Sequence, residues 1–308
     1  MSTADKESEL FRRHLGFALF VVGSVLVFWM PLKKLISFSL THDYGSHVIF
    51  VVPASGYLIY LKRREVFSRV QVSVFTGSSL FLAGTISGWE AHIYSRAQSD
   101  YFPVEILALV VLWLSGFMFC YGTRAFQTAR FPLLFLLLLV PIPDVLIEKV
   151  IFLLQAGSAA AAYWLLRIFG VPVFKQGVIL QLPTLDIEVA KQCSGIRSSL
   201  ALLITTLLLG EFILRSGWRK ALFVFSVVPI LILKNGARIV AVSLLAIYVD
   251  RGFLHGWLHT SGGILFYLLG LVMLIPIMTA LRKSEDKSGA TRSQNPAFSI
   301  ADVVGLKS

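Results

Sequence analysis

Charged side chains are scarce in this sequence. They make up 15% of its 308 residues, whereas 56% of the residues are hydrophobic and the mean hydropathy is +0.77. Soluble domains carry about 25% charged residues, so this chain has too little polar surface to fold as a soluble globule. The composition therefore predicts a polytopic membrane protein, with membrane lipids around its helices.

Cysteine is scarcer still. Cys120 lies inside an apolar run and Cys193 lies at the start of another, which indicates neither a disulfide framework nor a redox compartment. A convincing small-residue cleavage site is also missing from the first apolar run, Leu15–Leu32. We therefore expect this run to be kept as a membrane anchor rather than removed as part of a signal peptide.

Acidic residues are the rarer of the charged groups, with 17 Asp and Glu against 28 Lys and Arg, for a net charge of +11. The basic residues mostly occupy short loops between apolar runs, a pattern that orients membrane helices. Nucleic acid is therefore not an expected partner. From the charges we expect a cytoplasmic N-terminus at residues 1–14, a transmembrane domain at 15–283 and a disordered cytoplasmic tail at 284–308.

The apolar runs predict an all-α bundle with about eight spanning helices of ~20 residues each. The clear runs are Leu15–Leu32, Val48–Leu61, Val72–Trp89, Phe102–Tyr121, Ile196–Leu214, the run that begins at Ala221, and Ser261–Leu281. Two further candidates are Phe131–Val140 and Leu146–Phe169. The orientation of the basic loops allows only one of these two to span, so the other should be re-entrant, interfacial or merged with its neighbour. Which of them spans is open.

A different pattern occupies residues 170–190. There, Leu185, Ile187 and Val189 alternate with acidic residues, and Gly and Pro punctuate the segment. This period of two predicts a short β-hairpin outside the membrane. The hairpin would deliver the following residues, including Cys193, to the outer surface.

Cys193 is the candidate nucleophile. We expect it in the N-terminal turn of the helix that carries Ile196, where free backbone N–H groups and the helix dipole lower a thiol pKa. Gly195 limits the bulk beside the sulfur, and Arg197 adds a cation within one turn. Because a cysteine in a membrane helix is more often an inert small side chain, the groups around it decide its role.

Two further chemical groups are expected at the same outer level. The segment KNGAR places Lys234, Asn235 and Arg238 at membrane depth. Arg238 lies about 25 Å along the helix that re-enters from the cytoplasmic side, where a guanidinium costs about 2.5–3.5 kcal/mol and usually faces the bundle interior. Snorkelling to the interface is the alternative. His255 and His259 precede the last apolar run. A thiol nucleophile, a histidine acid and base, and a fixed positive charge for an oxyanion would together form an acyl-transfer site.

The segments CSGIRS, NGARI and HGWLHTSGG resemble the exosortase/archaeosortase family of integral membrane cysteine transpeptidases, and so do DYGSHVIFVVP and PIPDVLIEK. The resemblance implies that Cys193 is the nucleophile, Arg238 the catalytic arginine and His259 the catalytic histidine. His255 is the weaker candidate, because it does not lie four residues before Gly263.

The resemblance covers about Asp43 to Pro276 but has two departures. Two dipeptides differ from the family's commoner patterns, Lys191-Gln192 before Cys193 and Ser261-Gly262 before Gly263. The subfamily and its recognition motif are therefore not assigned.

The resemblance also implies the substrate and the location. Substrates would be secreted proteins that end in a short motif such as Pro-Glu-Pro, a membrane helix and a basic cluster. The enzyme would cut near the motif and transfer the acyl group to a polysaccharide or lipid acceptor. This reaction would be linked to extracellular polysaccharide and would need no cofactor. An inside-positive substrate helix would place its motif at the periplasmic or extracellular face of the plasma (inner) membrane.

Two other functions compete with this one. The first is a metal-dependent membrane hydrolase, because His255 and His259 are four residues apart and further ligands are expected on the same side. Those ligands are His42, Asp43 and His47. The second is a non-enzymatic export or transport component, in which a buried Arg238 would line the pathway.

Overall fold

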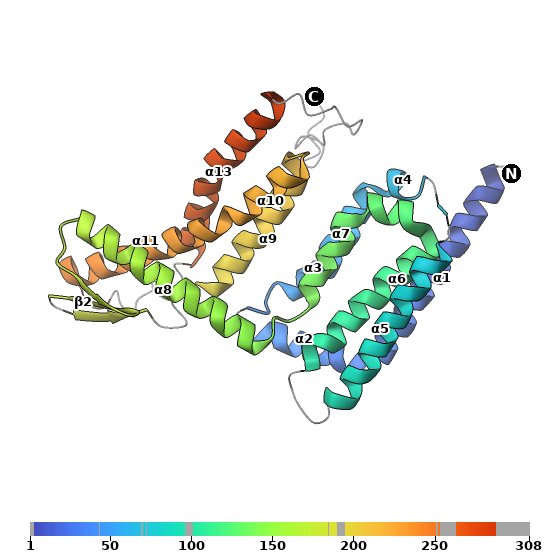
Figure 1. Ribbon diagram of the computed structural model, residues 1–308, viewed down its shortest axis with the longest axis horizontal. Helices are drawn as coiled ribbons and strands as arrows, with labels where there is room; N and C mark the ends of the chain where they lie inside the picture. The colour runs from blue at the N-terminus through green and yellow to red at the C-terminus, as the bar shows by residue number, and fades with distance from the viewer. Residues whose placement is uncertain are drawn as a thin grey trace. The chain divides into compact units, whose positions relative to one another are not determined.

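The computed structural model describes residues 3–42, 44–68, 70–71, 73–95, 101–183, 185–189, 195–250, 252 and 263–287. The chain forms two compact units, residues 1–147 and 148–308, and the boundary falls inside helix α8 (Asp144–Ile168). Figure 1 shows that both units are built mainly of long helices.

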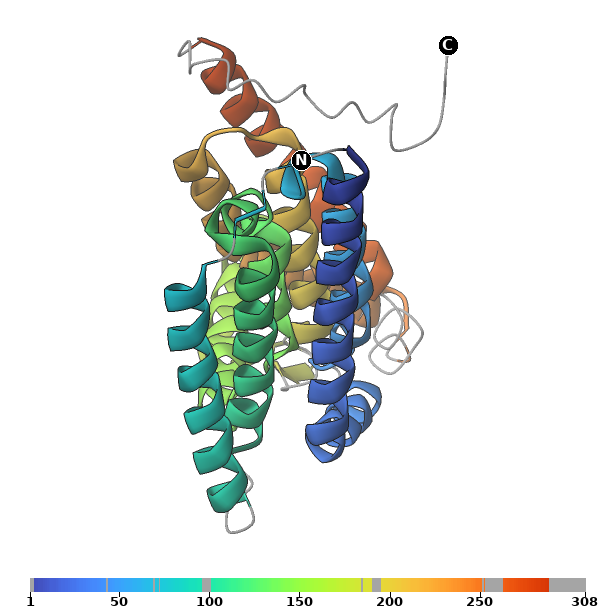
Figure 2. The same cartoon turned by 90° about the vertical axis from the view of Figure 1, so that its right-hand side faces the viewer.

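Helix α6 is the centre of the first unit. The unit contains α1 (Thr3–Val27), α2 (Trp29–Thr41), α3 (Val48–Leu61), α4 (Arg63–Val66), α5 (Val74–Ser95), α6 (Phe102–Thr128), α7 (Arg130–Phe135) and the 3-10 helix η2 (Leu136–Leu139). Helices α1, α2, α4, α5 and α7 all pack on α6, and α5 lies alongside it (Figure 2). Trp113 of α6 donates a hydrogen bond from Nε1 to Ser24 Oγ of α1 at 2.8 Å, which joins the two helices in the apolar interior.

Helix α6 is interrupted near its end at Gly122. This residue has φ of +82°, a conformation that glycine adopts without steric cost. The backbone N–H of Gln71 donates to the carbonyl of Tyr121 at 3.3 Å, and a Cβ on Gly122 would collide with the Gln71 carbonyl oxygen. The glycine therefore permits the close approach of the 70–71 segment to the helix.

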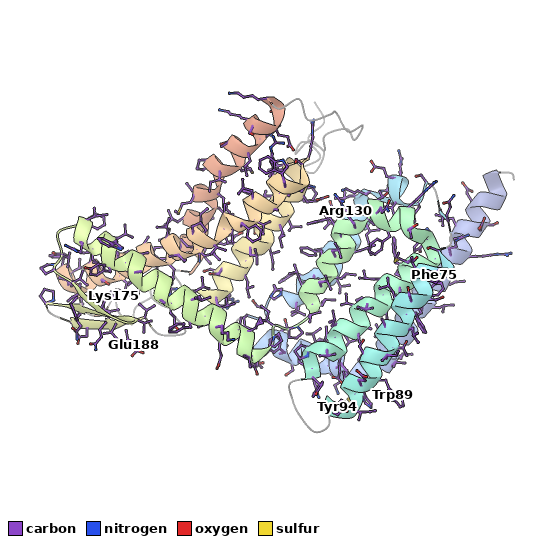
Figure 3. All side chains as sticks on the ribbon, viewed as in Figure 1. Phe75, Trp89, Tyr94, Arg130, Lys175 and Glu188 are labelled. Carbon is purple, nitrogen blue, oxygen red and sulfur yellow. The ribbon has the colours of Figure 1, made fainter. Side chains whose placement is uncertain are left out.

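Six helical segments in the described part of the chain are long and apolar enough to cross a membrane. They are Glu7–Val27, Phe102–Thr128, Asp144–Ile168, Ile196–Ile213, Gly217–Tyr248 and Gly263–Lys287, and two shorter apolar segments, Val48–Leu61 and Arg130–Leu139, accompany them. This confirms the predicted polytopic helical class, with six segments of spanning length rather than about eight. Helix α5 is not one of the six, although Phe75, Trp89 and Tyr94 are exposed along it (Figure 3).

The two candidates between Arg130 and Cys193 differ clearly in length. Helix α8 has 25 residues, whereas the earlier candidate forms the six-residue α7 and then the four-residue η2, and the backbone is extended at Val140. Of the two, the structure therefore favours the later one, predicted as Leu146–Phe169, as the spanning segment.

Long helices form most of the described part of the second unit. Besides α8 it contains β1 (Phe174–Gln176), β2 (Ile179–Leu182), β3 (Leu185–Glu188), α9 (Ile196–Ile213), α10 (Gly217–Phe225), α11 (Val227–Tyr248) and α13 (Gly263–Lys287). Helices α9, α10, α11 and α13 pack on one another. Their shared core includes Leu202, Phe223, Ile230 and Leu274.

The predicted β-hairpin corresponds to β2 and β3, which pair antiparallel with Leu180 opposite Ile187. Strand β1, which the alternation did not indicate, adds a third antiparallel strand with Lys175 opposite Leu180. Leu180 and Leu182 pack against Leu166 of α8 and Val240 of α11. The sheet therefore packs against the C-terminal halves of these two helices; Figure 3 labels Lys175 and Glu188 on it.

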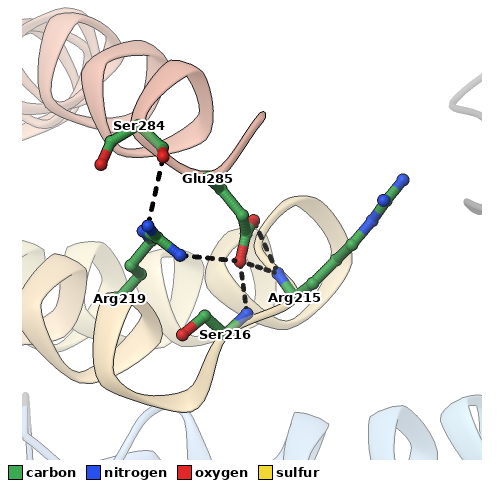
Figure 4. A network of polar contacts seen from close by, with 5 residues as sticks. All are labelled: Arg215, Ser216, Arg219, Ser284 and Glu285. Atoms are coloured by element: carbon green, nitrogen blue, oxygen red, sulfur yellow. Dashed lines mark hydrogen bonds and ion pairs between the residues drawn. The ribbon is translucent and has the colours of Figure 1, made fainter. Parts of the chain in front are cut away.

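A buried carboxylate fastens the last turns of α13. Glu285 accepts hydrogen bonds from the backbone N–H groups of Arg215 at 3.0 Å and Ser216 at 2.5 Å, and its Oε1 lies 3.7 Å from Nη1 of Arg219 (Figure 4). Arg219 Nη2 also donates to the Ser284 carbonyl at 3.2 Å. These contacts, here called the Glu285 cluster, join α13 to the loop between α9 and α10. The helix continues to Lys287, past the residue 283 expected as the end of the membrane domain.

Candidate active site

The structure places one of the three predicted catalytic residues. Arg238 lies on α11 and is partly buried. Cys193 and His259 lie outside the described residues, as does the alternative His255. Their meeting with Arg238 therefore stays a prediction, and the site is built here from the residues that flank Cys193.

Gly195 caps the N-terminus of α9, two residues after the cysteine. It has φ of +65° and ψ of 25°, a left-handed conformation, and its carbonyl accepts from the Ser199 N–H at 2.8 Å and from Ser198 Oγ at 3.0 Å. A Cβ on Gly195 would lie 3.1 Å from Oδ1 of Asn235. Glycine is thus favoured here by its backbone conformation and by the closeness of α11, in addition to the small bulk noted from the sequence.

Lys234 of α11 reaches the first turn of α9. Its Nζ donates a hydrogen bond to Ser198 Oγ at 2.6 Å, and the residue is 1% exposed. Because the Ser198 hydroxyl donates a hydrogen bond to the Gly195 carbonyl, a continuous chain of hydrogen bonds runs from α11 to the cap of α9. We call Lys234, Ser198, Gly195, Asn235 and Ser158 the Lys234 cluster.

Asn235 joins the same cluster to α8. Its Nδ2 donates to Ser158 Oγ at 3.0 Å, and both side chains are buried. The next residue, Gly236, lies so close to α8 that a Cβ there would come within 2.7 Å of the Ala161 Cβ. The Asn-Gly pair therefore lets α11 approach α8 closely at this point, while its amide satisfies a buried hydroxyl.

Val189, the last described residue before Cys193, is also held by α8. Gln155 Nε2 donates to the Val189 carbonyl at 2.7 Å in a buried hydrogen bond. Val189 itself is buried in the cluster formed by the sheet, α8 and α11. Residues 190–194, which include Cys193, thus connect two fixed points in the second unit.

Arg238 follows Lys234 by one turn of α11, so the two cations lie on the same side of the helix. The Lys234 end of this face contacts the N-terminus of α9. Backbone N–H groups at a helix N-terminus add positive potential. The region is therefore suited to stabilise negative charge, whether on a thiolate or on an oxyanion.

The model of the transmembrane exosortase family matches residues 36–276, more than three quarters of the chain. The chain belongs to this family. The resemblance stated from the sequence is thereby confirmed, and the matched range contains the Lys234 cluster. Exosortases are multi-pass membrane peptidases or transpeptidases that process sorting signals. Comparisons with curated proteins and with solved structures found no match.

In this exosortase, two of the histidines considered as metal ligands, His42 and His47, lie in the described residues and contact other groups. His47 Nε2 lies 3.1 Å from the Leu138 carbonyl, and His42 stacks on Phe38 and contacts Thr41. Among the described residues, no group of three His, Cys, Asp or Glu is placed to hold a metal ion. Asp43, the remaining ligand proposed for that loop, lies outside the described residues.

The contacts of four polar residues in the candidate site were not predicted from the sequence. Lys234 and Asn235 were placed at membrane depth but given no partner, and Gln155 and Ser158 were not singled out. A signal was present for both pairs. Gln155 and Ser158 are polar residues three apart in the apolar run LLQAGSAAAA, which puts them on one helix face.

Proposed function

We propose that this exosortase is a membrane-embedded cysteine peptidase and transpeptidase that cleaves C-terminal sorting signals of exported proteins. Cys193 is the nucleophile, Arg238 the oxyanion-stabilising cation and His259 the acid and base. The observation that carries this proposal is the attachment of the cysteine segment at both ends, by Gln155 before it and by the Lys234 cluster after it.

The proposed chemistry proceeds by acyl transfer. His259 takes the proton of the Cys193 thiol, and the thiolate attacks the scissile carbonyl to form a tetrahedral intermediate. Arg238 stabilises the negative oxygen, and His259 then gives its proton to the departing amine. An acceptor nucleophile, or water, attacks the resulting thioester and releases Cys193.

The substrate is expected to combine a PEP-CTERM-like motif, a membrane helix and a basic tail. Its inside-positive helix would orient the motif toward the periplasmic or extracellular face of the plasma (inner) membrane, where we place Cys193. The acceptor would be a polysaccharide or lipid, which links the reaction to extracellular polysaccharide.

The test is processing of a reporter that carries the motif, helix and basic tail. Cys193→Ala and Cys193→Ser are expected to reach the membrane in normal amounts and to abolish cleavage, because the thiol is the nucleophile. The matched control is Cys120→Ala. Cys120 contributes its backbone carbonyl to Arg13 at 2.8 Å, and this contact survives the substitution, so activity should be retained. Cleavage by Cys193→Ala would refute the proposal.

A further inference from the structure

Lys234 is the most buried charged side chain that the structure describes, at 1% exposure. Removing an ammonium group from water is costly, particularly within a membrane helix. An apolar residue of similar length, such as methionine, would pack in the same space without that penalty. The lysine therefore requires an explanation from its contacts.

The contacts of Lys234 lead toward the catalytic segment. Within the described residues, the acceptor of its Nζ is Ser198 Oγ, at 2.6 Å, and Ser198 in turn donates to the Gly195 carbonyl at 3.0 Å. A hydrogen bond from a charged donor is shorter and stronger than one between neutral groups. The chain of hydrogen bonds therefore ends at Gly195, two residues after the proposed nucleophile in sequence.

A third helix directs the lysine side chain. Gly270 of α13 leaves room for its stem, because a Cβ on Gly270 would lie 3.3 Å from Lys234 Cδ and 2.8 Å from Leu202 of α9. Three helices thus determine the position of the ammonium group. Arg238 lies one turn further along α11, so the same helix holds the α9 cap and carries the proposed oxyanion cation.

We propose that Lys234 is a positioning residue for the reaction at Cys193, acting through Ser198 to hold the cap of α9 in place against α11. The inference rests on the proposed function. Without the ammonium group, the first turn of α9 can shift relative to Arg238. A displacement of about 1 Å at a reacting centre lowers the rate by about 100-fold. The substrate helix and its basic tail do not depend on this hydrogen bond, so KM should change little.

The experiment compares Lys234→Met, Ser198→Ala and the double variant, with a purified reporter substrate and enzyme amounts equalised in the membrane. Each single variant is expected to lower kcat by about 10- to 100-fold, with KM within about twofold of the wild-type value. The double variant should be no slower than the slower single variant, because both substitutions break the same hydrogen bond. The matched control is Lys220→Met. Lys220 is a partly exposed lysine that pairs with Glu211 at 2.6 Å, and its loss should leave kcat within about twofold.

Wild-type kcat in Lys234→Met, a rise in KM alone, or multiplicative losses in the double variant would each overturn the inference. If Lys234→Met fails to reach the membrane, Ser198→Ala decides, and full kcat in that variant is a negative result. Cys193→Ala is measured alongside. Cleavage by that variant defeats the proposed function, whereas an inactive Cys193→Ala beside a fully active Lys234→Met defeats only the role of Lys234.

Discussion

Two buried polar clusters in the described part of the second unit stabilise a buried charge in different ways. In the Glu285 cluster, a buried carboxylate meets a guanidinium and two backbone N–H groups. In the Lys234 cluster, the described acceptor of the buried ammonium is a neutral hydroxyl. The first arrangement compensates charge with charge, whereas among the described residues the ammonium of the second is held by its hydrogen bond to Ser198.

We infer from this difference a structural role for the Glu285 cluster and a functional role for the Lys234 cluster. Glu285 and Arg219 join helix ends that are 66 residues apart in sequence, and they lie outside the segments CSGIRS and NGARI. The Lys234 cluster includes Gly195 and Ser198 of CSGIRS and Asn235 of NGARI, and Lys234 directly precedes NGARI, so this cluster holds the cap that follows Cys193 in sequence. A buried ion pair fastens helices, whereas a cation held by a neutral group leaves positive potential for a reacting anion.

The largest expected effect is on stability, at the Glu285 cluster. Glu285→Ala leaves the Arg219 guanidinium without its carboxylate and removes the acceptor of two N–H groups, which should lower the free energy of unfolding by about 3–5 kcal/mol. Thermal unfolding in detergent measures this loss. The cleavage rate per folded molecule should stay unchanged. A variant with normal stability but a reduced rate would reverse the roles assigned to the two clusters.

For Arg238 we expect a loss of cleavage rate without a loss of stability. Arg238→Lys keeps the charge, but a flexible ammonium does not reproduce two fixed donors, so kcat should fall by about 100- to 1000-fold at normal membrane abundance. Arg238→Ala should be at least as slow. Single-turnover cleavage measures both. If Arg238 were only a partner for a carboxylate, then Arg238→Lys would keep a near-normal rate, and that result would remove the oxyanion role.

The rate at which an alkylating agent labels Cys193 in these variants shows at which step Arg238 acts. An unchanged rate of thiol labelling in Arg238→Ala would place the arginine after thiolate formation. Slower labelling would mean that its charge favours ionisation of the thiol.

The sequence predicted the helices well because membrane insertion depends on local composition. Runs such as Ile196–Leu214 carry their own signal in length and hydropathy, and α9 ends at Ile213, one residue from the predicted end. Strand β1 escaped prediction because FKQ lacks the alternation that marks β3. Its place depends on pairing with β2, a tertiary contact.

For the candidate site, the sequence indicates residue types but not their contacts. Hydropathy shows that Lys234 is unusual in an apolar helix, but not that it meets Ser198, because the register between α9 and α11 depends on packing at Gly236 and Gly270. The family resemblance supplied the roles of Cys193 and His259, which lie outside the described residues. Their geometry is therefore still a prediction.

The smallest expected effect, and the most local, is at Gly195. An alanine in the left-handed conformation costs about 1–2 kcal/mol, and its Cβ would lie 3.1 Å from Asn235 Oδ1, so the cap must shift against α11. We expect Gly195→Ala to lower kcat by about tenfold with a modest loss of stability.

The matched control for this change is Gly217→Ala. Gly217 begins α10, and a Cβ there meets nothing within 4 Å. It should leave both rate and stability close to normal, because the position is helical and open. Equal effects of the two substitutions on kcat would show that the cap geometry of α9 does not control the reaction. A selective loss in Gly195→Ala, without the large loss of stability expected of Glu285→Ala, would show that the Lys234 cluster sets the position of the nucleophile rather than the stability of the fold.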